Sequence, residues 1–189
     1  MEWKIRDAAP DDAAALAEIY GPYVTDTAIT FEYEAPTPAA FQARMQSLLG
    51  RYPYLVAEQA GQALGYAYAG PFHPRAAYAW AAEVAIYLRR DCCGRGLGRA
   101  LYARLEEQCR AMGLQNLYAC VAAPAAPDPY LDDGSVQFHS RRGYALCGRF
   151  QRCGYKFGRW YDMVWMEKLL GSHPVPAPAL RFPTDLGQE

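Results

Sequence analysis

The protein has 189 residues, 52% of them hydrophobic and 14% aromatic, which is enough to bury the core of one ordinary domain. Its net charge of −1 at pH 7 argues against a nucleic-acid-binding surface, because such surfaces usually carry a basic surplus. No apolar run is long enough to span a membrane, and charged residues interrupt the N-terminus. We therefore expect no membrane span, no signal peptide and a cytoplasmic location.

Periodic apolar residues predict strands and helices along the sequence. The first predicted helix begins at Asp11 or Asp12, which can cap it, and ends at Gly21 and Pro22. Residues 59–62 form a predicted hairpin turn, and residues 154–160 connect the last two strands. The predicted strands are 2–8, 54–58, 63–69, 80–88, 116–122, 145–152 and 161–169, and the predicted helices are 12–20, 39–49, 97–112 and 134–142.

This order of elements predicts an α+β fold, in which helices cover both faces of a mixed central sheet. A strand, a crossover helix and a further strand imply one parallel pair near the centre of that sheet. From Gly171 onward prolines become frequent, which is typical of disordered segments. We therefore expect one domain over residues 1–170 and a disordered, proline-rich tail over residues 171–189.

The cysteines carry no metal-binding pattern, because the sequence has no C-x-x-C pair and no histidine at zinc-binding spacing. Cys109 falls on the apolar face of a predicted helix, and Cys120 lies in an apolar strand. Thiols in such positions behave as small hydrophobic groups. We therefore predict that the cysteines are buried and structural, and we expect no metal site.

The most informative stretch is the turn between the strand that ends at Leu88 and the helix that follows. Glycines at 94, 96 and 98 leave backbone N–H groups accessible, and the helix N-terminus adds partial positive charge. This suits a phosphate or pyrophosphate, as in acyl-CoA or a nucleotide, although a plain strand–helix turn explains the glycines as well. The G-x-G-x-G spacing, in the middle of the sequence, differs from that of a dinucleotide fold. Arg99 and Ala100 stand where a P-loop needs Lys and Ser or Thr.

Four ordered segments carry a resemblance to a known family. They are residues 5–8 with Asp12, residues 65–72, residues 83–101 and residues 154–160, and the last, GYKFGRW, is the most specific. Over about residues 2–169 the sequence resembles the GNAT acetyltransferase superfamily, in particular its phosphinothricin and methionine-sulfone acetyltransferase branch. The resemblance implies the GNAT fold, acetyl-CoA as co-substrate, direct acetyl transfer to the amine of a small amino acid or analogue, and a homodimer.

The resemblance also implies how acetyl-CoA is held. The backbones of Ile86 and Leu88 would pair with the pantetheine arm, and the amides from Gly94 to Arg99 would hold the pyrophosphate. Cys93 replaces the Gln or Arg that usually begins this loop, which should weaken cofactor binding modestly. The usual Asn of the following loop falls on Asp132 or Asp133, after an insertion at about residues 125–130. The implied cofactor-binding residues are Ile86, Tyr87, Leu88, Cys93, Gly94, Arg95, Gly96, Leu97, Gly98, Arg99, Asp132 and Ser135.

Acetyl transfer to an ammonium group requires a base that removes a proton from the amine. The branch places its catalytic carboxylate at Glu83, although the sequence alone also fits a solvated residue at the end of a strand. His139 stands where many GNAT enzymes have a proton-donating tyrosine. It is the second catalytic candidate, either as a base or as the acid that protonates the thiolate, and a surface histidine is its alternative. The predicted substrate-binding residues are Phe31, His73, Arg75 and Glu83.

Arg75 precedes the strand that carries Glu83, and a guanidinium there can bind an α-carboxylate with two hydrogen bonds. Acetylation of a peptide N-terminus or a polyamine is the alternative reaction, but the Arg75 loop has no acidic cluster for a polyamine. A non-catalytic acetyl-CoA sensor is an alternative of another class, which the presence of both Glu83 and His139 disfavours. Aromatic residues at 155, 157, 160 and 161 offer apolar area for a dimer interface.

Overall fold

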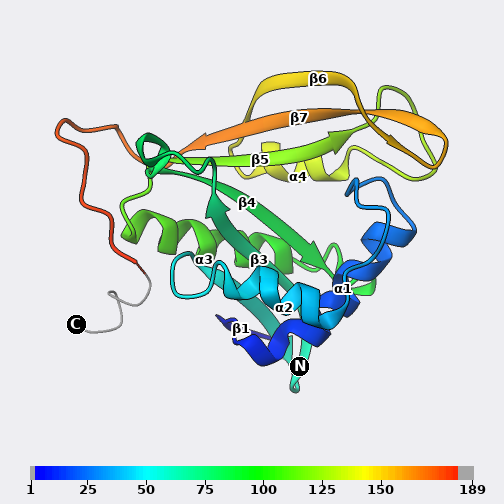
Figure 1. Cartoon of the computed structure of the whole chain (residues 1–189), viewed down its shortest axis with the longest axis horizontal. Coiled ribbons are helices and arrows are strands. Elements are labelled where there is room, and N and C mark those ends of the chain that lie inside the picture. The colour runs from blue at the N-terminus through cyan, green and yellow to red at the C-terminus, as the bar shows by residue number, and fades with distance from the viewer. Residues whose placement is uncertain (1–2, 183–189) are drawn as a thin grey trace.

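A computed structural model describes residues 3–182, which form one seven-stranded sheet flanked by helices (Figure 1). The strand order is β1-β2-β3-β4-β5-β7-β6, and every neighbouring pair is antiparallel except β4 and β5. The predicted mixed sheet with one central parallel pair is therefore confirmed. The strands are β1 (Lys4–Asp7), β2 (Tyr54–Gln59), β3 (Gln62–Pro71), β4 (Ala81–Leu88), β5 (Asn116–Ala123), β6 (Ala145–Lys156) and β7 (Arg159–Leu169), and the helices are α1 (Ala13–Thr25), α2 (Pro38–Gln46), α3 (Leu97–Ala111) and α4 (Gly134–Arg141).

Each face of the sheet packs against different helices, because successive residues of a strand point to opposite faces. Tyr54 and Tyr66 lie in a cluster with buried residues of α1 and α2. Leu55 and Ala67 lie in the cluster that contains the inner face of α3, and Phe138 of α4 packs against that same cluster. The prediction that helices cover both faces is confirmed.

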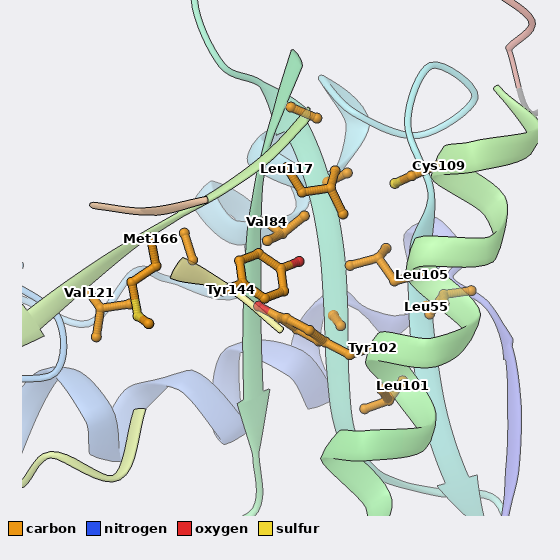
Figure 2. Close-up of a cluster of buried hydrophobic side chains, with 14 of the residues drawn as sticks. Leu55, Val84, Leu101, Tyr102, Leu105, Cys109, Leu117, Val121, Tyr144 and Met166 are labelled. Carbon is orange, nitrogen blue, oxygen red and sulfur yellow. The ribbon is translucent and has the colours of Figure 1, made fainter. Parts of the chain in front are cut away.

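The larger cluster fills the space between the sheet and α3 (Figure 2). Leu101, Leu105 and Cys109 follow one another on the inner face of α3, and all three are fully buried. They share the cluster with Val84 of β4 and Leu117 of β5. Burial of each of these leucines contributes about 1.5–3 kcal/mol. This packing fixes the N-terminus of α3, and the glycine turn before it, against the end of β4.

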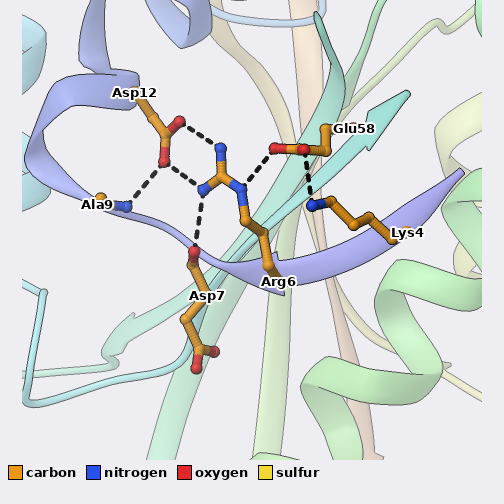
Figure 3. Close-up of polar contacts among 6 residues, drawn as sticks. All are labelled: Lys4, Arg6, Asp7, Ala9, Asp12 and Glu58. Atoms are coloured by element: carbon orange, nitrogen blue, oxygen red, sulfur yellow. Dashed lines mark hydrogen bonds and ion pairs between the residues drawn. The ribbon is translucent and has the colours of Figure 1, made fainter. Parts of the chain in front are cut away.

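A network of ion pairs ties β1 to the turn that precedes α1 (Figure 3). The Arg6 guanidinium donates two hydrogen bonds of 2.7 Å to the Asp12 carboxylate and one of 2.6 Å to Glu58 of β2. Asp12 also accepts the Ala9 backbone N–H at 2.8 Å. The Arg6 guanidinium holds the pKa of the Asp12 carboxyl below its ordinary value. Residues 5–8 and Asp12, one of the four segments that carry the resemblance, therefore position the N-terminus of α1.

α1 does not end at Gly21 and Pro22 as predicted, but continues to Thr25. Pro22 removes one backbone donor from the helix, and tertiary contacts outweigh that loss. Val24 is buried, and the Tyr23 hydroxyl donates to the Leu88 carbonyl at 2.6 Å. These long-range contacts are not visible in the local sequence.

Residues 154–160 do not form an open connection, because β6 extends to Lys156 and β7 begins at Arg159. Phe157 and Gly158 have φ of +49° and +72°, which is typical of the two-residue turn that matches the twist of a hairpin. The ammonium of Lys156 is buried and donates to the carbonyls of Val24 and Thr30 at 2.7 and 2.8 Å. The hairpin thus anchors the segment that connects α1 to α2.

The first part of the predicted disordered tail has defined contacts. The Pro178 carbonyl accepts the Trp80 indole N–H at 2.8 Å, and the Arg181 N–H donates to the Met112 carbonyl at 3.0 Å. Leu180 packs against the cluster beneath α3. These contacts of residues 171–182 add apolar burial and hydrogen bonds that oppose the loss of conformational entropy, and the disorder of the tail stays a prediction. Residues 183–189 lie outside the described residues.

The prediction for the cysteines is correct only in part. Cys109 and Cys92 are buried, whereas Cys93, Cys120, Cys147 and Cys153 are exposed. Cys120 is exposed because the apolar run of β5 alternates. Its neighbours Ala119 and Val121 lie in the cluster beneath α3, and Cys120 points away from that cluster. None of the helices within residues 3–182 is long and apolar enough to cross a membrane.

Candidate active site

β4 and β5 pair only over Ala81–Glu83 and Asn116–Tyr118, and a cleft of about 130 Å³ lies between them. Glu83 and Cys120 reach this cleft from the sheet face that carries α1 and α2, because Val84 and Val121 lie in the cluster beneath α3. Ser135 and His139 reach it from α4 on the opposite face. The cleft therefore passes through the sheet. Its lining residues are Ile29, Tyr68, Glu83, Val84, Ala85, Ile86, Tyr87, Ala119, Cys120, Val121, Ala122, Ser135 and His139.

Glu83 is half-buried at the last position where β4 pairs with β5. Its carboxylate forms no hydrogen bond or ion pair with any of residues 3–182, and burial raises its pKa above the ordinary value of 4.5. Cys120 is a neighbour across the cleft, and desolvation raises the pKa of its thiol to about 12, so the thiol stays protonated. A desolvated carboxylate without a partner is suited to remove a proton from an incoming amine.

His139 is 4% exposed, and both of its ring nitrogens are occupied. Nδ1 lies 2.8 Å from the Ser135 carbonyl, which can only accept, so Nδ1 carries a proton. Nε2 lies 2.8 Å from the Tyr102 hydroxyl and accepts from it. Burial lowers the pKa of His139 below its ordinary value of 6.5, so the imidazole is neutral at pH 7. Nε2 is therefore the ring nitrogen that can take up a proton, in competition with Tyr102.

The backbone of β4 presents unpaired groups to the cleft. A hydrogen bond of 2.8 Å from the Arg89 N–H to the Leu64 carbonyl shows that the odd-numbered residues here face β3. The N–H and C=O groups of Val84, Ile86 and Leu88 consequently point toward β5. The Val84 N–H still pairs with the Tyr118 carbonyl in the last parallel pair, so the Val84 C=O and the N–H and C=O of Ile86 are the first groups of β4 without a partner on β5. At Leu88 the Tyr23 hydroxyl already contacts the carbonyl, at 2.6 Å, and the N–H, at 3.4 Å. The sequence does not predict that contact.

The turn before α3 has the geometry that a phosphate site requires. Gly94 and Gly96 have φ of +78° and +82°, and no protein atom lies within 4 Å of the Cβ position at either residue. Gly96 is the N-cap of α3 and lacks any group that could cap the helix, so the amides of the first turn are open to an anion. Gly98 serves packing instead, because a Cβ there would lie 3.2 Å from the Phe138 ring. These residues fit the pyrophosphate of a CoA thioester.

The other predicted cofactor-binding residues are divided between the turn and α4. Cys93, Arg95 and Arg99 are exposed and flank the open amides. Ser135 lines the cleft, whereas Asp132 does not. Asp132 instead accepts the backbone N–H of Gly134 through Oδ1 at 2.9 Å, which shapes the start of α4.

The three further substrate-binding candidates do not line the cleft. His73 and Arg75 lie on the exposed loop between β3 and β4. Phe31 packs with Tyr161 under the β6–β7 hairpin, and its ring lies so close to Gly154 that no Cβ fits there. This contact explains the first glycine of the GYKFGRW segment as a packing requirement.

Sequence reasoning does not find Tyr68, Cys120 or Tyr102. Tyr68 and Glu83 share a sheet face, but this becomes visible only with the register that pairs Tyr68 with Ala85. Tyr102 belongs to the apolar face of α3, where its hydroxyl has no signal of its own in the sequence. Within residues 3–182, no group of three or more His, Cys, Asp or Glu residues is placed to hold a metal ion.

The protein is similar to known acetyltransferases over nearly its whole length. The profile of the family described as Acetyltransferase (GNAT) domain matches residues 5–165. A phosphinothricin N-acetyltransferase of Streptomyces viridochromogenes is 34% identical over 175 residues, which cover 93% of this sequence and 90% of that protein. An L-methionine sulfoximine/L-methionine sulfone acetyltransferase of Pseudomonas aeruginosa is 34% identical over 170 residues, covering 88% of this sequence and 94% of that protein. The crystal structure of a phosphinothricin acetyltransferase from Sinorhizobium meliloti in complex with AcCoA has a TM-score of 0.84, with 32% identity and 97% coverage of both proteins.

Proposed function

The protein belongs to the GNAT acetyltransferase family and is an acetyl-CoA-dependent N-acetyltransferase, and we propose that its acceptor is the primary amine of a small amino acid or analogue. The relatives that act on phosphinothricin and on methionine sulfone support this class of acceptor. The observation that carries the proposal is the cleft through the sheet, with an unpartnered, desolvated carboxylate on one face and the open amides of the glycine turn beside the other.

We place acetyl-CoA along β4 and the glycine turn. The amides from Gly94 to Arg99 would hold its pyrophosphate, and the backbone of Ile86 would pair with its pantetheine arm. Acetyl-CoA bound in this way supplies the thioester at the cleft. The backbone N–H of Ile86, which points into the cleft beyond the last pair of β4 with β5, is suited to stabilise the oxyanion.

We assign the removal of the amine's proton to Glu83, directly or through a water. Its raised pKa favours this role, because a general base works best when its pKa lies close to the pH at which the enzyme operates. His139 is the second proton-exchanging group, on the opposite face of the sheet. Its Nε2, once released by Tyr102, would take up the second proton, which the attacking nitrogen loses after the C–N bond forms, and give it to the thiolate of CoA as the C–S bond breaks.

We propose that Arg75 binds the α-carboxylate of the acceptor. Its guanidinium forms no hydrogen bond or ion pair with any of residues 3–182, and it lies on the loop that leads into β4. A free guanidinium can bind a carboxylate with two parallel hydrogen bonds. His73 on the same loop and Phe31 beneath the hairpin stay proposals as further acceptor contacts.

We propose a symmetric homodimer that forms through β6 and the β6–β7 hairpin. β6 is an edge strand, and large apolar residues are exposed on it, in the turn that follows it and at the start of β7. They are Leu146, Phe150, Tyr155, Phe157 and Trp160. Light scattering at micromolar concentration should give twice the 21.1 kDa mass of one protomer, and the mass of a single protomer would reject the dimer.

The test of the acceptor is an assay of CoA thiol release with methionine sulfone, phosphinothricin, spermidine and a short peptide. We expect turnover with the two amino acid analogues. Turnover with spermidine or the peptide alone would replace the proposed acceptor. Glu83→Gln should lower kcat about a hundredfold or more and remove the acid limb of the pH profile, while acetyl-CoA still raises the melting temperature. An unchanged kcat in this variant would reject Glu83 as the base.

A further inference from the structure

A row of buried polar groups leads from His139 into the interior of the protein. His139 Nε2 accepts from the Tyr102 hydroxyl at 2.8 Å, and Tyr102 is fully buried beneath α3 and does not line the cleft. The centroid of the Tyr102 ring lies 6.1 Å from that of Tyr144, the residue before β6. The rings of His139 and Tyr144 meet edge to face with centroids 5.3 Å apart. The nitrogen to which we assign the second proton therefore has its partner in the interior, and Tyr144 lies beside that partner.

Two polar atoms at the far end of this row form no hydrogen bond with any of residues 3–182. They are the Tyr144 hydroxyl and Glu106 Oε1, on side chains of residues that are 4% and 6% exposed. In Figure 2 the Tyr144 hydroxyl is directed toward α3, the helix that carries Glu106 about one turn after Tyr102. Burial raises the pKa of Tyr144, and the charge of the Glu106 carboxylate raises it further. The carboxylate therefore lies within electrostatic reach of this hydroxyl.

The other oxygen of the Glu106 carboxylate is already occupied. Lys168 of β7 donates to Oε2 at 2.7 Å, and the Arg110 guanidinium lies 3.7 Å from the same oxygen. The Lys168 ammonium also lies 5.6 Å from the centroid of the Tyr144 ring, so it holds the carboxylate near this ring. Oε1 is left as a buried acceptor without a donor, which costs free energy. A hydrogen bond from the Tyr144 hydroxyl, directly or through one buried water, would recover that cost.

Hydroxyl groups both donate and accept, so a row of them can reverse its direction. While His139 is neutral, the Tyr102 hydrogen points at Nε2 and Glu106 Oε1 has no donor. Once Nε2 carries a proton, it donates to the Tyr102 oxygen, and the Tyr102 hydrogen needs another acceptor. The Tyr144 oxygen can accept it, and the Tyr144 hydrogen can then point at Oε1. Every group of the row is paired in this second arrangement.

We propose that Tyr102, Tyr144 and Glu106 are positioning residues for proton exchange at His139: when Nε2 takes up a proton, the Tyr102 hydrogen turns from Nε2 to Tyr144, and the Tyr144 hydrogen turns to Glu106, directly or through one buried water. The added proton stays on His139, and only hydrogen bonds change direction within the row. The inference rests on the proposed function, because that function assigns the second proton to Nε2. It explains how Tyr102 releases this nitrogen.

The experiment follows the titration of His139 by NMR in the protein without ligand. The sequence has three histidines, and the signal that is lost in His139→Gln identifies this one. Tyr144→Phe removes the hydroxyl and keeps the ring. Because this hydroxyl has no partner while His139 is neutral, its loss should weaken only the protonated state. The midpoint of the His139 titration should therefore fall by about 0.4–1.1 pH units, the range of one hydrogen bond.

Tyr54→Phe is the matched control, because Tyr54 is 5% exposed and packs on the opposite face of the sheet, in the cluster with α1 and α2. It should leave the midpoint of His139 unchanged. Other titratable groups that face His139 or the end of the row are present in wild type and in both variants, so their influence cancels in the comparison. They are Glu83 and Cys120 in the cleft, and Cys109, Arg110 and Lys168 near Glu106.

Tyr102→Phe separates an effect through the row from an effect on packing. With Tyr102 absent the row is interrupted, so adding Tyr144→Phe or Glu106→Gln should no longer move the midpoint of His139. Glu106→Gln alone should lower it, as Tyr144→Phe does. Equal shifts with and without Tyr102, an unchanged midpoint in Tyr144→Phe, or the same shift in Tyr54→Phe would overturn the inference.

The titration needs no turnover, so it stands apart from the proposed function. Shifts that depend on Tyr102 support the row even where no amine is acetylated. Such shifts together with a wild-type kcat in His139→Gln would support the row and reject His139 as a proton-exchanging group of the reaction.

Discussion

On the α3 face of the sheet, aliphatic residues from the helix fill the space above Val84 and Leu117, whereas on the α1 and α2 face tyrosines enclose a cavity beside Glu83. The same strands build both faces, because alternation sends neighbours such as Glu83 and Val84 to opposite sides. The comparison teaches that one face supplies most of the packing that holds the fold together. The other face can then keep desolvated polar groups, which cost stability, at the places where chemistry needs them.

The largest expected effect is on the free energy of unfolding without ligand, and it tests whether the α3 face supplies most of the packing. Leu105→Ala opens a hole in the fully buried cluster beneath α3 and should lower the free energy of unfolding by about 2.7–5 kcal/mol. Tyr66→Phe on the other face removes an unpartnered hydroxyl and should change it by less than about 0.5 kcal/mol. Urea unfolding of the two variants without ligand measures both values. Similar losses would contradict the comparison.

The next effect concerns the glycine turn at the N-terminus of α3. A hundredfold excess of acetyl-CoA over its Kd should stabilise wild type by about 2.7 kcal/mol, and Gly96→Val should abolish this shift. Gly96 has φ of +82°, which a β-branched residue resists, so the open amides of the turn should lose their alignment.

Gly61→Val is the matched control for the turn. Gly61 has φ of +78° with an equally open Cβ position, but it lies in the β2–β3 turn, outside the proposed CoA site. This variant should lose stability and keep the shift with acetyl-CoA. A normal shift in Gly96→Val would reject the turn as the pyrophosphate site.

A smaller effect is expected at the loop between β3 and β4, and it tests whether Arg75 on this exposed loop binds the acceptor. Arg75→Ala should raise KM for amino acid acceptors about tenfold with little change in kcat, because hydrogen bonds to a charged carboxylate contribute about 1.5–3 kcal/mol in both the ground state and the transition state. Amines without a carboxylate should be unaffected in steady-state kinetics. Equal changes for both classes of acceptor would remove Arg75 from the site.

The sequence predicts those parts of the molecule that local patterns determine. The four-residue spacing of Leu101 and Leu105 predicts α3, and the glycines before it predict an anion site. Tyr68 and the tyrosine cavity are not predictable in this way, because they depend on how three strands pair in register. The extension of α1 past Pro22 has the same cause, since Val24 and Tyr23 are held by distant elements.

The resemblance of single segments to a family also conceals what each segment does. Glu83 lines the cleft, but Gly154 accommodates the Phe31 ring and Lys156 donates to two backbone carbonyls. Gly154 and Lys156 position the segment after α1 and do not line the cleft. A pattern shared among relatives therefore mixes chemistry with packing, and only the contacts separate the two.

The smallest effect distinguishes the two proposed proton-exchanging groups, one on each face. Burial lowers the pKa of His139 in the folded protein below its ordinary value of 6.5, so the unfolded protein binds this proton more readily. Stability contributed by neutral His139 should therefore be complete above about pH 6.5 and decline as the pH falls below it. Burial raises the pKa of Glu83, so the carboxylate form destabilises the fold as the pH rises through the ordinary value of 4.5. Urea unfolding between pH 5 and pH 7.5 should show a decline on acidification that is weaker in His139→Gln and steeper in Glu83→Gln, because protonation of Glu83 below its raised pKa stabilises the fold and opposes the decline. An identical pH dependence in wild type and His139→Gln would show that His139 is not held neutral by burial, and the assignment of a neutral imidazole whose Nε2 accepts from Tyr102 would fall with it.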